Sequence, residues 1–440
     1  MEQNNQYFDL DSYQARNLSN GRPPKKDDSG AFFGGLAVGV MSTLIVLCVA
    51  VLVIWSVNKG VLFDQGNKGQ QTTIQSVKGY GFVTDEMVKK IDKLVTDIRT
   101  MYYLDEVSDE ELETGLYRGL MSSLGDPYTE YYTNEEYIQL MQGASGIYYG
   151  IGAVVSIDSE TNLPKLGQIF KGSPAEKVGL RPNDLVYKVN GEATNGKSLS
   201  EVVSEIRGEE GTTVNITIIR DGNQLEVTPT RARLETPTVE TKMLENGMGY
   251  LQITEFDDVT LKQFTNGMEE LYADGMKGLI LDLRGNPGGN LSTVVEIARN
   301  LLPEGLVVYT ETKEGKRTDY KCKGDKEIQI PMVVLVDMNS ASASEILAGA
   351  IQDYGKGTLV GTTTFGKGIV RTIYPDREDG TAIKITVSGY FTPKGRNIHK
   401  IGIEPDIVCE FDADLYYDEV NPIDNQLEKA KEVLAGLMNK

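Results

Sequence analysis

The apolar positions of this chain follow four patterns in succession. Residues 31–57 form an apolar run that contains no charged residue. From residue 84, apolar residues recur at a spacing of three or four positions, which predicts amphipathic helices. Residues 144–233 hold short strand-like runs around two short helical segments. Residues 248–408 then alternate strand-like and helical runs, which predicts an α/β domain with a central sheet.

Capping and turn signals predict several element boundaries within these patterns. Capping boxes of the form Ser-x-x-Glu occur at residues 108–111 and 198–201, each ahead of a helical pattern. Ser173-Pro174 predicts another helix start, and Asn190-Gly191 predicts a hairpin turn. Residues 424–437 carry apolar side chains on one helical face, so we expect a C-terminal helix that docks on the body of the protein.

The apolar run at residues 31–57 is long enough to cross a membrane. A helix of this length would extend about 40 Å, against a hydrocarbon core of ~30 Å. A buried helix and a cleavable signal peptide are the alternatives, but a signal core is shorter and no A-x-A site ends the run. More positive charges precede the run than follow it closely, which favours a cytoplasmic N-terminus and an extracytoplasmic body after about residue 58.

Composition restricts the classes of function. The 440 residues allow about three domains. A net charge of −20 argues against a nucleic-acid partner, because no basic stripe is available to neutralise phosphates. With His399 as the single histidine, a zinc site is not expected, and no metal or organic cofactor is implied. Cys322 and Cys409 could form a disulfide, and the sequence does not decide whether they do.

A run of three serines stands where an apolar strand-like segment meets a helical one. Ser342 and Glu345 form a further capping box, so the serine could be a helix cap alone. The same position presents a hydroxyl beside the unpaired N–H groups of a helix N-terminus, which an oxyanion hole requires. The local pattern does not choose among Ser340, Ser342 and Ser344 as a nucleophile.

Lys367 lies between glycines and apolar segments. The stretch GTTTFGK matches seven positions of a phosphate-binding loop, but Gly368 replaces the required Ser or Thr and a strand-like run follows. A general base is the alternative, since burial among apolar neighbours can lower the pKa of a lysine from ~10.4 toward ~7–8. A Ser–His–Asp triad using His399 has no supporting motif.

Several long motifs together carry a family resemblance. SLGDPYTEYYT, LDLRGNPGG, SASASEILAGAIQD, TFGKG and GYFTPKGRNIHKIGIEPDI occur in this order. The chain from residue 83 onward resembles the C-terminal processing peptidase, or tail-specific protease, family. The resemblance implies a crotonase-like or ClpP-like core with Ser342 as nucleophile, Lys367 as base, and an oxyanion hole formed by the N–H groups of Ala343 and Gly288, with Gly289 as the alternative.

The region at residues 144–233 resembles the permuted PDZ domains found within bacterial proteases. In such domains a glycine-containing loop receives a peptide's C-terminal carboxylate, and the peptide adds as a strand. The matching loop here is Tyr149, Gly150, Ile151 and Gly152.

Two further positions are compared with the family pattern. Arg371 stands where the family has a glutamine that orients the lysine amine, and a guanidinium cannot accept a hydrogen bond. Its positive charge would instead help to keep Lys367 neutral. Asp353 matches a family aspartate that we interpret as structural.

The sequence therefore predicts a multidomain α+β protein that is anchored in the cell membrane. The expected parts are a disordered cytoplasmic tail (1–30), a transmembrane helix (31–57), a linker (58–82), a helical unit (83–143), a PDZ domain (144–233), a serine peptidase core (234–420) and a C-terminal helix (421–440). The expected function is extracytoplasmic endopeptidase cleavage near the C-termini of protein substrates whose free, apolar tails bind the PDZ domain. The alternatives are a PDZ scaffold with an inactive core and a crotonase-like acyl-transfer enzyme, and a homodimer is possible.

Overall fold

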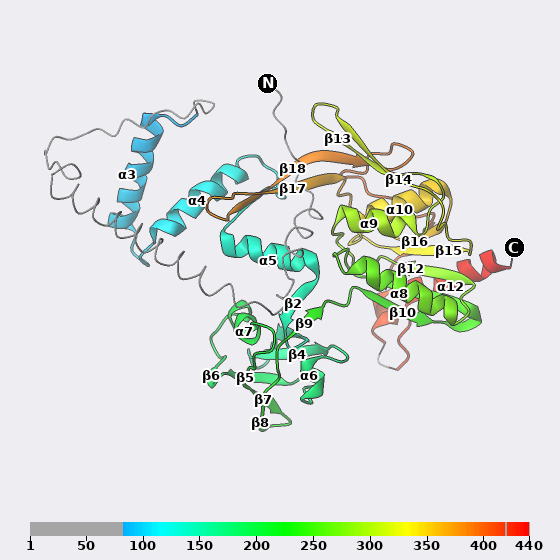
Figure 1. Cartoon of the computed structure of the whole chain (residues 1–440), viewed down its shortest axis with the longest axis horizontal. Coiled ribbons are helices and arrows are strands. Elements are labelled where there is room, and N and C mark those ends of the chain that lie inside the picture. Colours follow the sequence, from blue (N-terminus) through cyan, green and yellow to red (C-terminus); the bar gives the residue numbers. More distant parts are fainter. Residues whose placement is uncertain (1–81, 419, 440) are drawn as a thin grey trace, which may run out of the picture. The chain divides into compact units, whose positions relative to one another are not determined.

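The computed structural model describes residues 82–418 and 420–439 (Figure 1). The predicted cytoplasmic tail, transmembrane helix and nearly all of the linker lie outside these residues. In the part of the chain that is described, none of the helices combines the length and apolar character needed to span a bilayer. The chain divides into two compact units, Met1–Leu112 and Glu113–Lys440.

The described part of the first unit contains helix α3 (Asp85–Met101) and the start of α4 (Asp109–Ser122). Both helices begin where the sequence pattern predicts. The Thr84 side chain accepts a hydrogen bond from the N–H of Met87, and Ser108 and Glu111 form the expected reciprocal capping bonds. None of the α3 residues is fully buried, so its apolar stripe is only partly covered within the described residues.

The second unit includes a small β-domain in the region expected to be a PDZ domain. Its strands and helices are β2 (Ile147–Gly150), β3 (Ala153–Ile157), β4 (Pro164–Ile169), α6 (Pro174–Lys177), β5 (Leu185–Val189), β6 (Glu192–Ala193), α7 (Leu199–Ile206), β7 (Ile216–Arg220), β8 (Asn223–Val227) and β9 (Ala232–Glu235). The main sheet has the order β3-β4-β5-β7-β8, with β6 on β5, while β2 pairs with β9. The caps at Ser173 and Ser198 are formed as predicted. The segment is an insertion, because the Thr236 N–H donates to the Gly146 carbonyl at 2.8 Å, where the chain leaves and re-enters the body.

The body of the second unit is built on a six-stranded, mainly parallel sheet. Its strands, in spatial order, are β10 (Val239–Met243), β11 (Met248–Ile253), β12 (Gly278–Asp282), β15 (Met332–Val336), β16 (Thr358–Gly361) and β19 (Ile407–Val408), and β10 is antiparallel to β11. Leu279 and Leu281 of β12 pack in a core with helices α8 (Thr260–Ala273), α9 (Leu291–Arg299) and α10 (Ala343–Tyr354). Ile280, between them, packs on the opposite face with α12 (Asn425–Met438). Successive side chains of β12 therefore pack against helices on opposite faces of the sheet, which confirms the predicted α/β layout and the docked C-terminal helix.

A second sheet was not expected from the sequence pattern. It has the order β1-β18-β13-β14, with β17 also paired to β18. Its strands are β1 (Glu130–Tyr132), β13 (Gly305–Thr312), β14 (Arg317–Cys322), β17 (Ile369–Pro375) and β18 (Ala382–Phe391). Strand β1 lies between α4 and α5 (Asn134–Ser145), inside the range expected to be helical. The pairing of β1 with β18 attaches residues 130–132 to the sheet that contains β17, the strand that follows Lys367. The short helices η1 (Glu245–Gly247) and α11 (Ala413–Tyr416) complete the fold.

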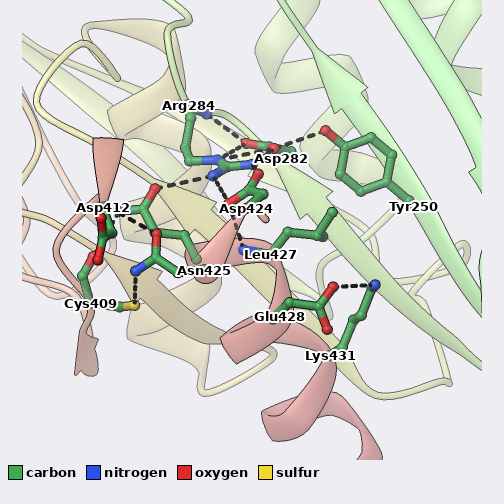
Figure 2. A network of polar contacts seen from close by, with 11 residues as sticks. Tyr250, Asp282, Arg284, Cys409, Asp412, Asp424, Asn425, Leu427, Glu428 and Lys431 are labelled. Atoms are coloured by element: carbon green, nitrogen blue, oxygen red, sulfur yellow. Dashed lines mark hydrogen bonds and ion pairs between the residues drawn. The ribbon is translucent and has the colours of Figure 1, made fainter. Parts of the chain in front are cut away.

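The C-terminal helix is attached to the body by a partly buried polar network (Figure 2). Arg284, which follows β12, donates to Asp282 and to Asp424, with Nη2–Oδ2 distances of 2.6 and 2.8 Å. Asp424 also caps α12 by accepting the N–H of Leu427 at 2.9 Å. Burial by itself raises the pKa of Asp424, but the hydrogen bonds from Arg284 and from the Leu427 N–H, together with the positive charge of Arg284, keep that pKa below its usual range. The helix start and the end of β12 are thus held together by paired charges.

The two cysteines among the described residues do not form a disulfide. Cys322 is buried in the core shared with α9, whereas Cys409 packs on the opposite face of the sheet beside α12. Both are free thiols.

Candidate active site

Ser342 occupies a strained turn between strand β15 and helix α10. Its φ and ψ are 55° and −111°, a backbone conformation that residues with a side chain rarely adopt. The Glu345 N–H donates to the Ser342 carbonyl at 2.9 Å, and the Tyr390 hydroxyl donates to the same carbonyl at 3.0 Å. Because the Glu345 N–H already donates to this carbonyl, it does not need the Ser342 hydroxyl as an acceptor. A sharp strand-to-helix turn of this kind presents a side chain at the helix N-terminus.

The structure distinguishes among the three serines that the local sequence pattern left equivalent, and it agrees with the choice of Ser342 that the family resemblance implies. Ser340 is completely buried, and its hydroxyl donates to the Leu283 carbonyl at 2.8 Å. Ser344 is also completely buried and donates to the Asn286 carbonyl at 3.0 Å. Ser342 is partly exposed. Of the three hydroxyls, that of Ser342 is the one accessible to a substrate.

Glu345 connects the serine turn to the lysine loop. Its carboxylate is completely buried, and Oε2 accepts the N–H of Ser342 at 2.9 Å and the N–H of Lys367 at 2.8 Å. Oε1 accepts the hydroxyl of Thr364 at 2.6 Å and the N–H of Gly366 at 2.8 Å. One carboxylate oxygen therefore holds the backbones of both candidate catalytic residues. The local sequence pattern predicts Glu345 only as a capping residue, although a carboxylate that opens the apolar helical segment EILAGA is a signal for a further role.

The amine of Lys367 lies in surroundings that favour its neutral form. Burial, followed by the positive charges of Arg371 and Lys384, lowers its pKa to about 8, against weaker opposing effects from Glu345 and Glu130. This agrees with the shift that the apolar flanking segments predict. Among the residues that the structure describes, Lys367 Nζ makes no hydrogen bond, and none joins it to Ser342 Oγ; such contacts are often long before substrate binds.

The turn that contains Gly288 lies directly against Ser342. A Cβ atom at Gly288 would lie 2.7 Å from Ser342 Cβ and 3.0 Å from the Ala343 nitrogen, so no side chain fits here. The Gly288 N–H donates to Asn286 Oδ1 at 2.8 Å. The N–H groups of Ala343 and Gly289 have no acceptor among the described residues. The predicted oxyanion residues Ala343 and Gly288 therefore lie next to each other beside Ser342, and the Gly288 N–H already donates to Asn286.

The predicted carboxylate loop of the PDZ region is partly strand. Tyr149 and Gly150 end β2 and pair with β9, while Ile151 and Gly152 form the link to β3. The N–H groups of Ile151 and Gly152 lack an acceptor within the described part of the chain. Arg207, which no sequence motif marks, lies beside this link: its Cγ is 3.8 Å from where a Cβ at Gly150 would stand. Strand β3 is at the edge of its sheet, so its outer side is available for a further strand.

The remaining candidates do not form sites of their own. Strand β17 follows Lys367 where a phosphate-binding loop needs a helix, which excludes that alternative. Asp353 accepts the N–H of Lys394 at 2.8 Å and pairs with Arg396, which agrees with its structural interpretation. Within the described residues, no cluster of three or more His, Cys, Asp or Glu side chains is arranged to hold a metal ion.

Comparisons with known proteins show which family the chain is similar to. Residues 247–409 match the family described as "Peptidase family S41", and residues 168–220 match "PDZ domain". A "Carboxyl-terminal-processing protease" of Synechocystis is 36% identical over 323 residues, which cover 72% of this chain and 75% of the relative. The "Carboxy-terminal processing protease CtpA" of Bacillus subtilis is 36% identical over 333 residues, covering 74% and 70%.

A solved structure, "Photosystem II D1 C-terminal processing protease", aligns with a TM-score of 0.44 at 28% identity, covering 74% of this chain and 94% of that one. The family rests on the sequence relatives, which are more than 30% identical over most of their own length. The chain therefore belongs to peptidase family S41 and is a serine-type carboxyl-terminal processing peptidase with a PDZ domain.

Proposed function

We propose that this peptidase is a membrane-anchored, extracytoplasmic endopeptidase that cleaves protein substrates near their C-termini with a Ser342–Lys367 dyad. The observation that carries the proposal is the shared Glu345 carboxylate, which holds the backbones of both residues. The mainly parallel sheet and its covering helices support the crotonase-like or ClpP-like description of the core.

The chemistry follows from the surroundings of the two side chains. Neutral Lys367 accepts the proton of the Ser342 hydroxyl as its oxygen attacks the scissile carbonyl, and the resulting ammonium protonates the departing amine. The acyl-enzyme on Ser342 is then hydrolysed by a water that Lys367 deprotonates. A lysine with a pKa of about 8 has an appreciable neutral fraction near neutral pH, which an unperturbed lysine lacks.

The developing oxyanion requires N–H donors beside Ser342. The Ala343 N–H at the start of α10 has no acceptor among the described residues and is suited to this role. Gly288 can supply the second donor after its bond to Asn286 Oδ1 breaks, and Gly289 offers an N–H that is already unengaged. Forming the complete hole thus requires a local rearrangement at Asn286 or use of the neighbouring glycine.

The PDZ domain is suited to recruit substrate tails. The Ile151 and Gly152 N–H groups can receive a terminal carboxylate, Arg207 adds a positive charge beside them, and the edge of β3 can accept the tail as a strand. The uncharged run at residues 31–57 supports a single membrane anchor with the N-terminus in the cytoplasm.

Cleavage of a peptide with an apolar, free C-terminus tests the catalytic proposal. The wild type should cleave it, whereas Ser342→Ala and Lys367→Ala should be inactive with unchanged thermal unfolding. Normal turnover by Lys367→Ala would refute the dyad. A wild type that binds the peptide but neither cleaves it nor is labelled by a serine-directed probe would support the scaffold alternative.

A further inference from the structure

The segment between α4 and β1 covers the amine of Lys367. Asp126 fixes this segment: its Oδ2 accepts the hydroxyl of Thr386 on β18 at 2.6 Å, and its Oδ1 accepts the N–H of Tyr128 at 3.0 Å. Strand β1 continues the attachment, with Glu130 opposite Lys384 and their side chains 2.6 Å apart. A segment distant in sequence is thereby held against the strands that follow the lysine loop.

Tyr128 is the residue of this segment that contacts Lys367. Its ring centroid is 4.8 Å from Lys367 Nζ and 5.9 Å from the guanidinium carbon of Arg371. The ring is half-buried. Lys367 Nζ donates no hydrogen bond to any described residue. The face of the Tyr128 ring carries partial negative charge, and it is the group that the amine contacts directly.

We propose that the ring of Tyr128 is the positioning residue that orients the Lys367 amine in the peptidase reaction. A lysine acts as a base through its lone pair, which must point toward the serine hydroxyl while the N–H bonds point elsewhere. The face of an aromatic ring accepts N–H groups weakly from an amine and more strongly from an ammonium. Arg371 offers only donors, so it cannot perform this role. This inference rests on the proposed dyad.

The ring acts differently from the charges that face Lys367. Those charges are Arg371 on β17, Lys384 on β18, Glu130 on β1 and Glu345 on α10. The ring is uncharged but prefers the protonated amine, so its loss should lower the pKa of Lys367 if an apolar covering remains. Its loss should also free the amine to rotate, which lowers the rate at every pH.

Three variants separate the ring face from its hydroxyl and from general packing. Tyr128→Phe keeps the face, Tyr128→Leu keeps only an apolar covering, and Tyr131→Leu removes a neighbouring aromatic ring that contacts Tyr117 instead. We expect Tyr128→Phe to stay within about twofold of wild type. Tyr128→Leu should lose about tenfold or more in kcat at the high-pH plateau with KM unchanged. In its pH–rate profile, the rise of activity with pH should shift to lower pH by about half a unit. Tyr131→Leu should resemble wild type.

The outcomes distinguish this inference from the proposed function. An inactive wild type would refute the dyad itself. With an active wild type, the inference is overturned if Tyr128→Leu matches Tyr131→Leu in plateau rate and pH profile, or if it becomes more active. Equal loss in Tyr128→Phe and Tyr128→Leu would also overturn it by assigning the effect to the hydroxyl. If Tyr128→Leu does not fold, a clear loss of activity in folded Tyr128→Phe would still overturn the inference.

Discussion

Replacing Arg371 with alanine removes a cation from the surroundings of Lys367, and the size of the effect can be worked out from the structure. Both groups contact the ring of Tyr128, at 4.8 and 5.9 Å from its centroid, so they lie no more than about 11 Å apart. At that distance two unit charges in an effective dielectric of ~20 interact by about 1.5 kcal/mol, and salt reduces this to roughly half. The interaction disfavours the ammonium form, so its removal should raise the pKa of Lys367 by about 0.5 to 1 unit.

The assay is the pH dependence of kcat/KM on a short peptide. For the wild type, activity should rise with pH and level off above about 8, because the neutral amine is the active form. In Arg371→Ala this limb should move to higher pH, so that activity at pH 7 falls by about three- to tenfold while the plateau is kept. Arg371→Gln should show the same displacement, and any rise of its plateau above wild type would report improved orientation of the amine.

Matched variants identify the charge as the cause. Arg371→Lys keeps the cation and should keep the wild-type profile. Arg377→Ala removes an equal charge from the exposed turn after β17 and should not change the pH at which activity rises. Identical profiles for wild type, Arg371→Ala and Arg371→Gln would refute the electrostatic reasoning, since the arginine would then have no influence on the base.

Further predictions concern positioning, recognition and stability. Glu345→Gln should lower kcat by about 100-fold in folded protein, because an amide nitrogen cannot accept the N–H groups that the carboxylate now holds; near-normal kcat would contradict this. Ser340→Ala and Ser344→Ala should each retain most activity while losing about 1 kcal/mol of stability, measured by thermal unfolding; complete inactivity of either folded variant would question the choice of nucleophile. Amidating a substrate's C-terminus should raise KM by about tenfold or more, and equal kcat/KM for both peptides would remove the PDZ domain from recognition. Arg284→Ala should destabilise the body by about 3 kcal/mol by leaving the buried Asp282 carboxylate and the partly buried Asp424 carboxylate without their partner, and an unchanged melting curve would contradict that.

The sequence predicted what local pattern encodes and missed what distant contacts create. Helix starts at Ser108, Ser173 and Ser198 could be predicted because a cap and the helix that it begins are neighbours in the chain. Strand β1 could not, because three residues between helices become a strand only through pairing with β18, some 250 positions later.

The site shows the same division between local and distant information. Ser342 and Lys367 were identified through motifs, yet neither the choice among three serines nor the bridging role of Glu345 could be read locally. Both depend on which side chains the fold buries. Tyr128 lies in a motif that was noted only for its resemblance, and its contact with the amine depends on the docking of a segment more than 200 residues away.

The hydrogen bond between Thr236 and Gly146 has a consequence for how such an enzyme can arise and be re-engineered. The inserted segment starts and finishes at one point of the body, so its loss or gain requires the host chain to close only a short loop, which costs little conformational entropy. An ancestral peptidase could therefore acquire a peptide-binding module in a single genetic event. The same junction offers a place to exchange that module for another, and so to redirect the peptidase to new tails while leaving its own chemistry unchanged.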